Sequence, residues 1–209
     1  MYAAYACTKK TIFTVSERKG LKGRSHMWKQ QFQHYKPFNE QEEADLRVIN
    51  RCIEMFDDVL TRDNEIAHFT ASGFVVNASR DKVLMVHHNI YNSWGWTGGH
   101  ADGESDFLQV AVREALEETG VEAKPVSTDI FSIDVLQVLA HVKKGKYVTP
   151  HIHLNITYLL EASESANLTV AEEENSGVEW IAFDDVLNRV AEEHMHPVYT
   201  KLMQKVKEL

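Results

Sequence analysis

Three glutamates at helical spacing, Glu114, Glu117 and Glu118, are the residues of this chain best suited to chemistry. Residues three and four apart share one face of a helix, so the three carboxylates are expected to lie close together. Like charges at that spacing repel each other by roughly 0.2–0.5 kcal/mol per pair, so helix stability does not require them. A divalent cation would relieve this repulsion, and carboxylate oxygens are ligands suited to Mg²⁺ and Mn²⁺. The spacing therefore predicts a metal-binding face.

The residues around the glutamates specify a helix that follows a glycine-rich turn. Asp106 is suited to cap the helix N-terminus, with Gln109 three residues on, and Gly120 is placed to end the helix in a left-handed conformation. Upstream, Gly98 and Gly99 permit close turns that bring backbone groups toward a ligand. An acidic helix face beside such a turn predicts a site that holds a metal ion against a phosphate.

The stretch Gly99–Val121 resembles the signature of the Nudix hydrolase family, which runs from a glycine through a spaced glutamate to Arg-Glu-apolar-x-Glu-Glu-x-Gly-apolar. The positions that match it are Arg113, Glu114, Glu117, Glu118, Gly120 and Val121, and Ala115 fills the first apolar position. Ser105 departs from the signature, because it stands where the family has its early glutamate. Carboxylates flank it at Glu104 and Asp106, and the role of the missing glutamate is assigned to neither.

The resemblance implies hydrolysis of a pyrophosphate bond in a nucleoside diphosphate linked to another group. Divalent cations, Mg²⁺ or Mn²⁺, would neutralise the phosphate oxygens and acidify the attacking water. The implied metal ligands are Glu114, Glu117 and Glu118, with the Gly98 carbonyl as a further ligand by analogy with the family. Glu117 and Glu118 are the implied catalytic carboxylates, and Arg113 would orient a neighbouring glutamate.

In relatives the general base comes from the helix or from a later loop. An acidic run that includes Glu174 lies in such a loop before Trp180, and Glu174 is the candidate taken from it. A solvated surface is the ordinary interpretation of an acidic run, and it also applies to three glutamates on a helix when they are seen alone.

Aromatic residues and histidines near these motifs are candidate substrate contacts. Trp94 and Trp96 lie just before the glycine turn and are placed to stack on a base, with core packing as the alternative. His151 and His153 alternate along an expected strand, so both point to one face, where they would contact a phosphate or be half-buried and hydrogen-bonded. The neighbouring histidines have no spacing that demands zinc; they are His87, His88 and His100.

Two other functions compete with hydrolysis. A non-catalytic sensor of a nucleotide or sugar nucleotide would not need to keep the three glutamates. A Nudix-fold isomerase of isopentenyl diphosphate would require a cysteine near the glycine turn, and the two cysteines, Cys7 and Cys52, are elsewhere.

Composition is typical of one principal domain with an extension. The chain has 209 residues, of which 44% are hydrophobic, enough to bury a substantial core. The net charge of −9 argues against a general nucleic-acid binder but not against a small anionic substrate held by metal ions. No apolar stretch reaches bilayer-spanning length, and two cysteines are too few for a disulfide framework. We therefore expect a cytoplasmic protein that does not contact membranes.

The chain divides into three expected parts. Residues 1–38 form an irregular basic arm, for which disorder is expected. Residues 39–65 form an amphipathic helical extension, with Asn39 as N-cap of a helix over 40–62 and a homodimer through this helix as one possibility. Residues 66–209 form the Nudix-like domain.

The domain itself is expected to alternate strands and helices. β-Rich runs are expected at residues 68–77, 82–88, 92–97, 130–142, 147–162 and 178–183, with a hairpin turn at 143–146. Closing helices are expected at 184–193 and 197–207, the second with Pro197 in its first turn. This α/β pattern predicts a mixed β-sheet between helices, in agreement with the α/β/α sandwich that the resemblance implies.

Overall fold

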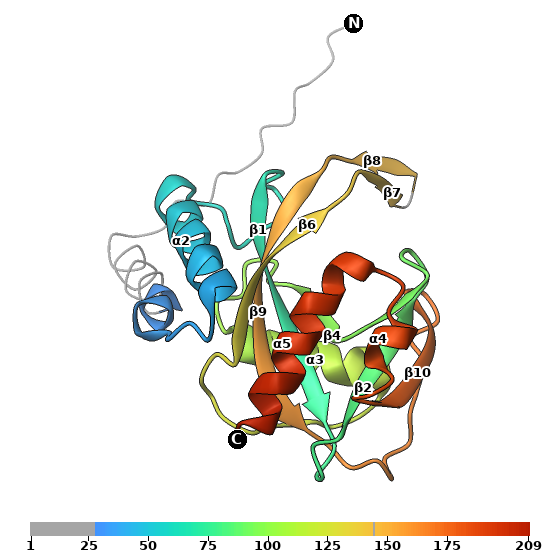
Figure 1. Ribbon diagram of the computed structural model, residues 1–209. Helices are drawn as coiled ribbons and strands as arrows, with labels where there is room; N and C mark the ends of the chain where they lie inside the picture. Colours follow the sequence, from blue (N-terminus) through green and yellow to red (C-terminus); the bar gives the residue numbers. More distant parts are fainter. Residues whose placement is uncertain (1–27, 144) are drawn as a thin grey trace, which may run out of the picture.

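A mixed β-sheet with helices on both faces forms the centre of the molecule (Figure 1). The computed structural model describes residues 28–143 and 145–209. After a helical segment at residues 28–34, the elements in chain order are α2 (Glu40–Met55), β1 (Ala67–Val76), β2 (Lys82–His88), β3 (Ser93–Gly95), β4 (Thr97–His100), α3 (Phe107–Thr119), β5 (Lys124–Pro125), β6 (Ser132–Val138), β7 (His141–Lys143), β8 (Lys146–Val148), β9 (His151–Glu161), β10 (Asn175–Ala182), α4 (Val186–Arg189), a 3₁₀ turn (Glu193–Met195) and α5 (His196–Lys207).

Strand β1 is the central strand of the sheet, and all ten of its residues are buried. It pairs in parallel with β9, where Phe69 lies beside Leu154, and antiparallel with β2 and β4. The path β10-β2-β1-β9-β5 carries the sheet across the molecule, and β6 pairs with β9. Because the sheet combines parallel and antiparallel pairs, the predicted mixed sheet is confirmed.

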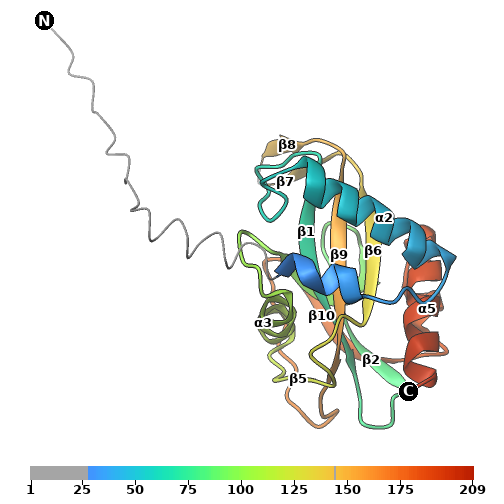
Figure 2. The same cartoon turned by 90° about the vertical axis from the view of Figure 1, so that its left-hand side faces the viewer.

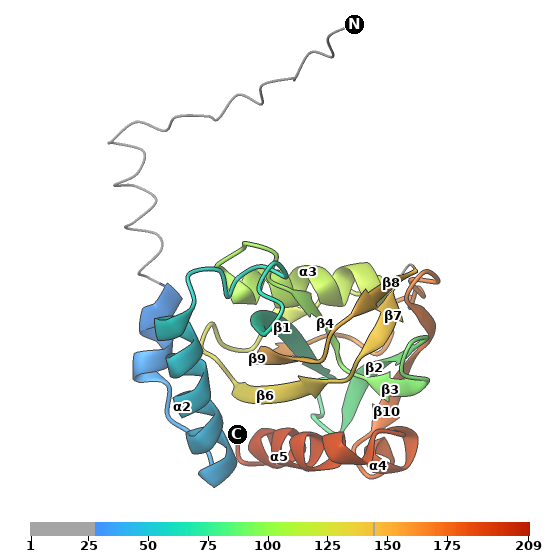
Figure 3. The same ribbon diagram turned by 90° about the horizontal axis from the view of Figure 1, so that it is seen from above.

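Two hydrophobic cores fill the spaces on the two sides of the sheet. Helix α3 covers one face, and α4 and α5 cover the other (Figure 3). Val110 and Ala115 of α3 pack into the first core, whereas Leu202 of α5 packs into the second. The chain therefore forms the α/β/α sandwich that the sequence predicts, and α3 lies directly on the sheet.

The N-terminal extension packs on the domain as two helical segments (Figure 2). Most of the predicted basic arm, residues 1–27, lies outside the described residues. From residue 28 to residue 34 the chain is helical rather than irregular, and Trp28 and Phe32 insert into the first core beside Phe69 and Phe107. Two large aromatic side chains explain this difference, because burying them stabilises the segment against the domain.

A buried ionic network joins α2 to α5 and β6. The Glu42 carboxylate accepts hydrogen bonds from the Tyr35 hydroxyl at 2.6 Å and from Lys205 Nζ at 2.9 Å. Lys201 Nζ lies 3.2 Å from Glu42 and 2.8 Å from Asp134, and its side chain is only 3% exposed. Charges removed from water to this degree are tolerated only when they are paired, so this network fixes the position of α2.

Helix ends differ from the prediction at two places. The helix predicted over 40–62 ends at Met55, where Phe56 becomes extended and no basic residue supports the C-terminus. The following segment instead forms a turn, in which Asn64 Nδ2 donates to Asp58 at 2.8 Å. The helix predicted over 184–193 covers only Val186–Arg189, because the chain then turns so that the Ala191 N–H donates to Ser93 Oγ.

The predicted strands are present with shifted ends, but the run predicted over 147–162 is divided between β8 and β9, and β5 was not predicted. The predicted hairpin at residues 143–146 corresponds to the paired strands β7 and β8, while the run predicted over 130–142 breaks into β6 and β7. Among the described residues, no helix is long and apolar enough to cross a membrane.

Candidate active site

Helix α3 carries the three glutamates, and its two caps are those that the sequence predicts. Asp106 accepts a hydrogen bond from the Gln109 N–H at 3.1 Å, and Gly120 ends the helix with a φ of 72°. The opposite side of the helix is buried against β1 and β4 through Val110 and Ala111. The helix is thus held on its apolar side, which leaves the acidic face to define a site.

Glu118 is the most deeply buried of the three carboxylates, at 4% exposure. Its Oε2 accepts a hydrogen bond from the Gly98 N–H at 2.9 Å, and the Asn175 amide lies 3.5 Å from its Oε1. Burial raises the pKa of Glu118 to about 8, although these two donors lower it and the charges of Glu114 and Glu174 add to the rise. Burial and the neighbouring carboxylates thus make the charged form of Glu118 unfavourable where it lies.

Glu114 lies directly against the glycine turn. A Cβ placed on Gly99 would be 2.5 Å from the Glu114 carboxyl carbon and 2.6–2.7 Å from its two oxygens. Real Cβ atoms essentially never lie this close to a non-bonded atom. Glycine at position 99 therefore leaves room for this carboxylate, and a larger residue would displace it. Burial raises the pKa of Glu114, the Arg113 guanidinium opposes the shift, and Glu117 and Glu174 add to it.

Arg113 interacts with the carboxylates of Glu114 and Glu117. Its Nη2 donates to Glu114 Oε1 at 2.9 Å, and its Nε is 3.9 Å from Glu117 Oε1. The Glu117 side chain is 61% exposed, so it is the most solvent-accessible of the three carboxylates. One guanidinium thus orients two carboxylates, as expected for an arginine that acts through its neighbours.

The two carboxylates that flank Ser105 have other partners. Glu104 Oε1 accepts from the backbone N–H groups of Ser105 and Asp106, at 2.7 and 2.9 Å. These hydrogen bonds lower the pKa of Glu104, desolvation opposes the shift, and the charge of Arg113 adds to the lowering. Asp106 caps α3, so both side chains support the start of the helix.

The acidic loop before β10 reaches the same site. The Glu174 carbonyl accepts from the Asn89 N–H at 3.0 Å, and the charge of Glu174 raises the pKa of both Glu114 and Glu118. The next residue, Asn175, is buried, and its Oδ1 has no hydrogen-bond partner in the described part of the chain. Sequence reasoning missed Asn175 because an asparagine in an acidic loop carries no recognisable pattern.

The residues at this site fit a divalent cation. The carboxylates of Glu114 and Glu118 lie beside the glycine turn, and Glu174 is within electrostatic range of both. These are oxygen ligands, which suit Mg²⁺ or Mn²⁺ better than softer metals. A cation would also stabilise the charged form of Glu118, which burial and the neighbouring carboxylates disfavour.

The two tryptophans have different environments. Trp96 packs in the second core, where its ring meets Tyr199 edge-on at 5.2 Å, and it is 8% exposed. The Trp96 ring therefore has no face free to stack on a base, because it is packed in the core. Trp94 is half-buried, and the Arg189 guanidinium lies 4.7 Å from its ring centre.

The two histidines of β9 lie together. His151 and His153 are half-buried, and their Nε2 atoms are 3.3 Å apart. Two further histidine rings, His68 of β1 and His100 of β4, are within 5.1 Å of His153, measured between ring centroids. His100 follows Gly99 directly, so this histidine cluster adjoins the glycine turn.

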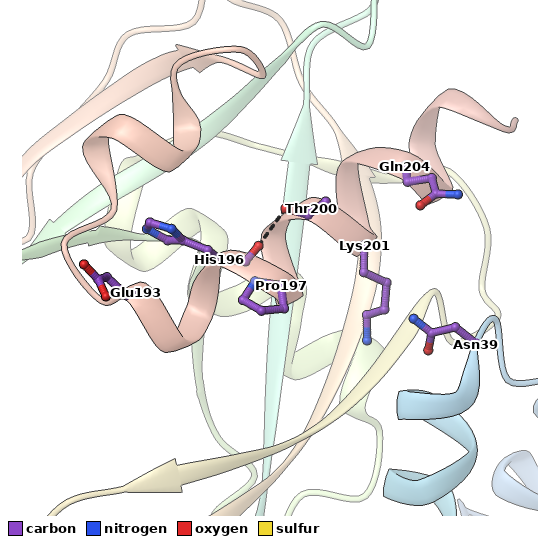
Figure 4. Close-up of a pocket in the computed structure, with 7 residues that line it drawn as sticks. All are labelled: Asn39, Glu193, His196, Pro197, Thr200, Lys201 and Gln204. Atoms are coloured by element: carbon purple, nitrogen blue, oxygen red, sulfur yellow. Dashed lines mark hydrogen bonds between the residues drawn. The ribbon is translucent and has the colours of Figure 1, made fainter.

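A surface hollow lies at a different place. It is lined by residues of α5, by Glu193 of the 3₁₀ turn before α5 and by Asn39. Figure 4 shows Lys201 extending there from α5 toward the start of α2. Helix α5 covers the face of the sheet opposite α3 (Figure 3). This hollow therefore belongs to the joint between α5 and the N-terminal extension and not to the carboxylates.

Comparisons with known proteins give one clear result. The family described as NUDIX domain matches residues 67–202, which is more than half of the chain. Among curated proteins, no relative matches.

Solved structures give partial similarities. A NUDIX-family hydrolase from Clostridium perfringens is 22% identical over 66% of this chain and 96% of its own, with a TM-score of 0.47. An Ap4A hydrolase from C. elegans is 17% identical over 67% and 95%, with a TM-score of 0.45. MutT from Aliivibrio salmonicida and Vibrio cholerae is 13% identical over 66% and 98%, with a TM-score of 0.43. The family assignment rests on the domain match.

Proposed function

Because the chain belongs to the Nudix hydrolase family, we propose that it hydrolyses the pyrophosphate bond of a small nucleoside diphosphate derivative with the help of Mg²⁺ or Mn²⁺. The observation that carries this proposal is the gathering of Glu114 and Glu118 against the Gly98–Gly99 turn. Two carboxylates lie close together against the backbone of this turn, and burial raises the pKa of both, so a bound cation would stabilise their charged forms.

We assign the metal ligands to Glu114, Glu117 and Glu118, with the Gly98 carbonyl as a further oxygen. When bound, the metal ion would neutralise the phosphate oxygens and make water a better nucleophile. Arg113 keeps Glu114 and Glu117 oriented through its guanidinium. The Gly98 N–H holds Glu118 toward the turn.

We assign the general base to Glu174. Its backbone is held by hydrogen bonds to Asn89 and Ala171, each 3.0 Å long, and its charge reaches Glu114 and Glu118. A base placed at the edge of the carboxylate group can accept a proton from the attacking water. Glu174→Gln is expected to reduce kcat much more than it weakens Mn²⁺ binding, because the loss of its charge near Glu114 and Glu118 lowers the cation affinity only in part. Glu173→Gln, at the neighbouring exposed position, is expected to change neither.

The experiment that tests the function is a panel of nucleoside diphosphate derivatives with Mg²⁺, in which the products of pyrophosphate cleavage are measured. The wild-type chain should cleave at least one compound, and Glu118→Gln should lower kcat at least about 100-fold. Glu122→Gln, at an exposed position beyond the helix, is the matched control and should retain activity. Tight binding of a nucleotide without cleavage would contradict hydrolysis and indicate a sensor.

A further inference from the structure

Four histidines from three strands gather beside the glycine turn. His68 of β1 and His153 of β9 are direct neighbours in the parallel pairing, and His100 ends β4 on the other side of β1. One ring nitrogen from each of these three residues lies within 4.8 Å of the other two. His151, two residues before His153 on the same face of β9, adds a fourth ring.

The hydrogen bonds of His68 determine which nitrogen is available. Its Nδ1 is 2.9 Å from the Asn64 carbonyl oxygen. A carbonyl can only accept, so Nδ1 carries the hydrogen and Nε2 carries a lone pair. That Nε2 is buried and receives no hydrogen bond from the described part of the chain, while His68 as a whole is 4% exposed. A buried lone pair without a donor is what a bound Lewis acid would satisfy.

His151 is oriented in the same way. Its Nδ1 is 2.8 Å from the Thr149 carbonyl oxygen, so its Nε2 also carries a lone pair. A backbone carbonyl behind the ring is the usual support of a metal-binding histidine, because it fixes the tautomer and the ring orientation. The 3.3 Å between Nε2 of His151 and Nε2 of His153 matches the separation of about 3.3 Å between two nitrogens bound at about 2.0–2.1 Å to one tetrahedral zinc.

The charges around the cluster favour a cation over an anion. His68 and His151 each donate from Nδ1 to a backbone carbonyl and offer a lone pair at Nε2. A lone pair repels a phosphate oxygen, whereas it is a good ligand for zinc. The nearby cation Arg62 is paired with Asp102, whose Oδ1 accepts from Arg62 Nε at 2.7 Å.

We propose that His68, His100 and His153 bind one Zn²⁺ ion, with His151 as the fourth ligand. This site is separate from the glutamates of α3, because its ligands are ring nitrogens of the strands and not oxygens of the helix. It joins β1, β4 and β9 at one point, and it fixes His100, the residue next to Gly99. Bound zinc therefore stabilises the strands from which the glycine turn is built.

The test is a Zn²⁺ titration of the full chain after removal of metals with a chelator. Competition with a chromophoric chelator is carried out in excess Mg²⁺, which occupies oxygen sites. The expected result is one Zn²⁺ per chain and a rise in Tm of about 5–10 °C at a free zinc concentration 100-fold above Kd. X-ray absorption at the zinc edge should give nitrogen ligands at about 2.0–2.1 Å.

Variants locate the ion. His100→Gln and His153→Gln should each weaken zinc binding at least about tenfold, and Glu118→Gln should leave it unchanged. His194→Gln is the matched control, because His194 is an exposed histidine in the turn before α5. If a variant fails to fold, the wild-type chain still decides the matter, because zinc must shift the imidazole ¹⁵N resonances of His68, His100 and His153.

Two results would overturn the proposal. One is the absence of stoichiometric zinc binding by the wild-type chain. The other is zinc binding that is lost in Glu118→Gln but retained in His100→Gln, since the ion would then lie at the carboxylates.

Discussion

Gly99→Ala probes the geometry of the candidate active site through a single methyl group. The new Cβ would lie 2.5 Å from the Glu114 carboxyl carbon, whereas ordinary contacts begin at 3.4 Å. The carboxylate must therefore retreat by about 1 Å, a displacement sufficient to disturb a catalytic constellation. The φ of Gly99 is not in the left-handed region, so alanine causes no backbone strain at this position.

The expected effect is a loss of metal affinity without a loss of fold. Displacing one ligand by this amount should weaken Mn²⁺ binding roughly 10–100-fold, equivalent to about 1.4–2.7 kcal/mol. Calorimetric Mn²⁺ titration measures the affinity and needs no knowledge of the substrate. The Tm should change little, because the atoms that must move are at the free end of a half-buried side chain.

A double-mutant cycle identifies the cause. Glu114→Asp shortens the side chain by one methylene and withdraws the carboxylate from residue 99. If the methyl group acts by displacing Glu114, the effects of Gly99→Ala and Glu114→Asp on Mn²⁺ affinity should be less than additive. Wild-type affinity in Gly99→Ala, or strictly additive effects in the double variant, would refute the assignment of this carboxylate as a ligand.

Three further predictions concern stability. Gly98→Ala places a Cβ 2.7 Å from the Ala71 carbonyl oxygen, which is backbone and cannot move aside, so the free energy of unfolding in urea should fall by at least about 2 kcal/mol; an unchanged value would be inconsistent with this packing. Lys201→Met leaves the buried Asp134 carboxylate without its cation and should cost about 3–5 kcal/mol, seen as a Tm lower by roughly 6–20 °C. A Tm within about 2 °C of wild type, equivalent to about 1 kcal/mol or less, would argue against the network. Burial raises the pKa of Glu42, but its hydrogen bonds and the charge of Lys201 more than offset this and lower it to about 2. The folded-state pKa is thus below the unfolded value, so this carboxylate stabilises the fold above about pH 4.5, and the contribution is lost as pH falls toward 2. The free energy of unfolding of the wild-type chain should therefore fall between about pH 4.5 and pH 2 more steeply than that of Glu42→Gln. The same slope in the wild type and the variant would contradict the pKa assignment.

The acidic helix could be predicted from the sequence because its signals are local. Asp106 and Gly120 lie at the ends of the segment they cap, and Glu114, Glu117 and Glu118 share a face by helical spacing alone. The strands were recognisable for the same reason, since alternation and apolar runs extend over neighbouring residues. The end of the helix predicted over 184–193 carried no such local signal, because Ser93, which accepts from the Ala191 N–H, lies far away in the sequence.

Contacts between distant segments could not be predicted. His68, His100 and His153 come from three strands, and only the sheet register brings their rings together. The same holds for Lys201 and Glu42, whose ion pair joins helices far apart in the chain. A sequence pattern describes one element at a time, so a cluster built across elements leaves no spacing to recognise.

The most direct test of the central claim is anomalous diffraction from crystals of the wild-type chain soaked in Mn²⁺. The account predicts a strong peak between α3 and the glycine turn, bonded to carboxylate oxygens of Glu114 and Glu118. The absence of any peak there, with Glu114 still bound to Arg113 and Glu118 still bound to the Gly98 N–H, would contradict it.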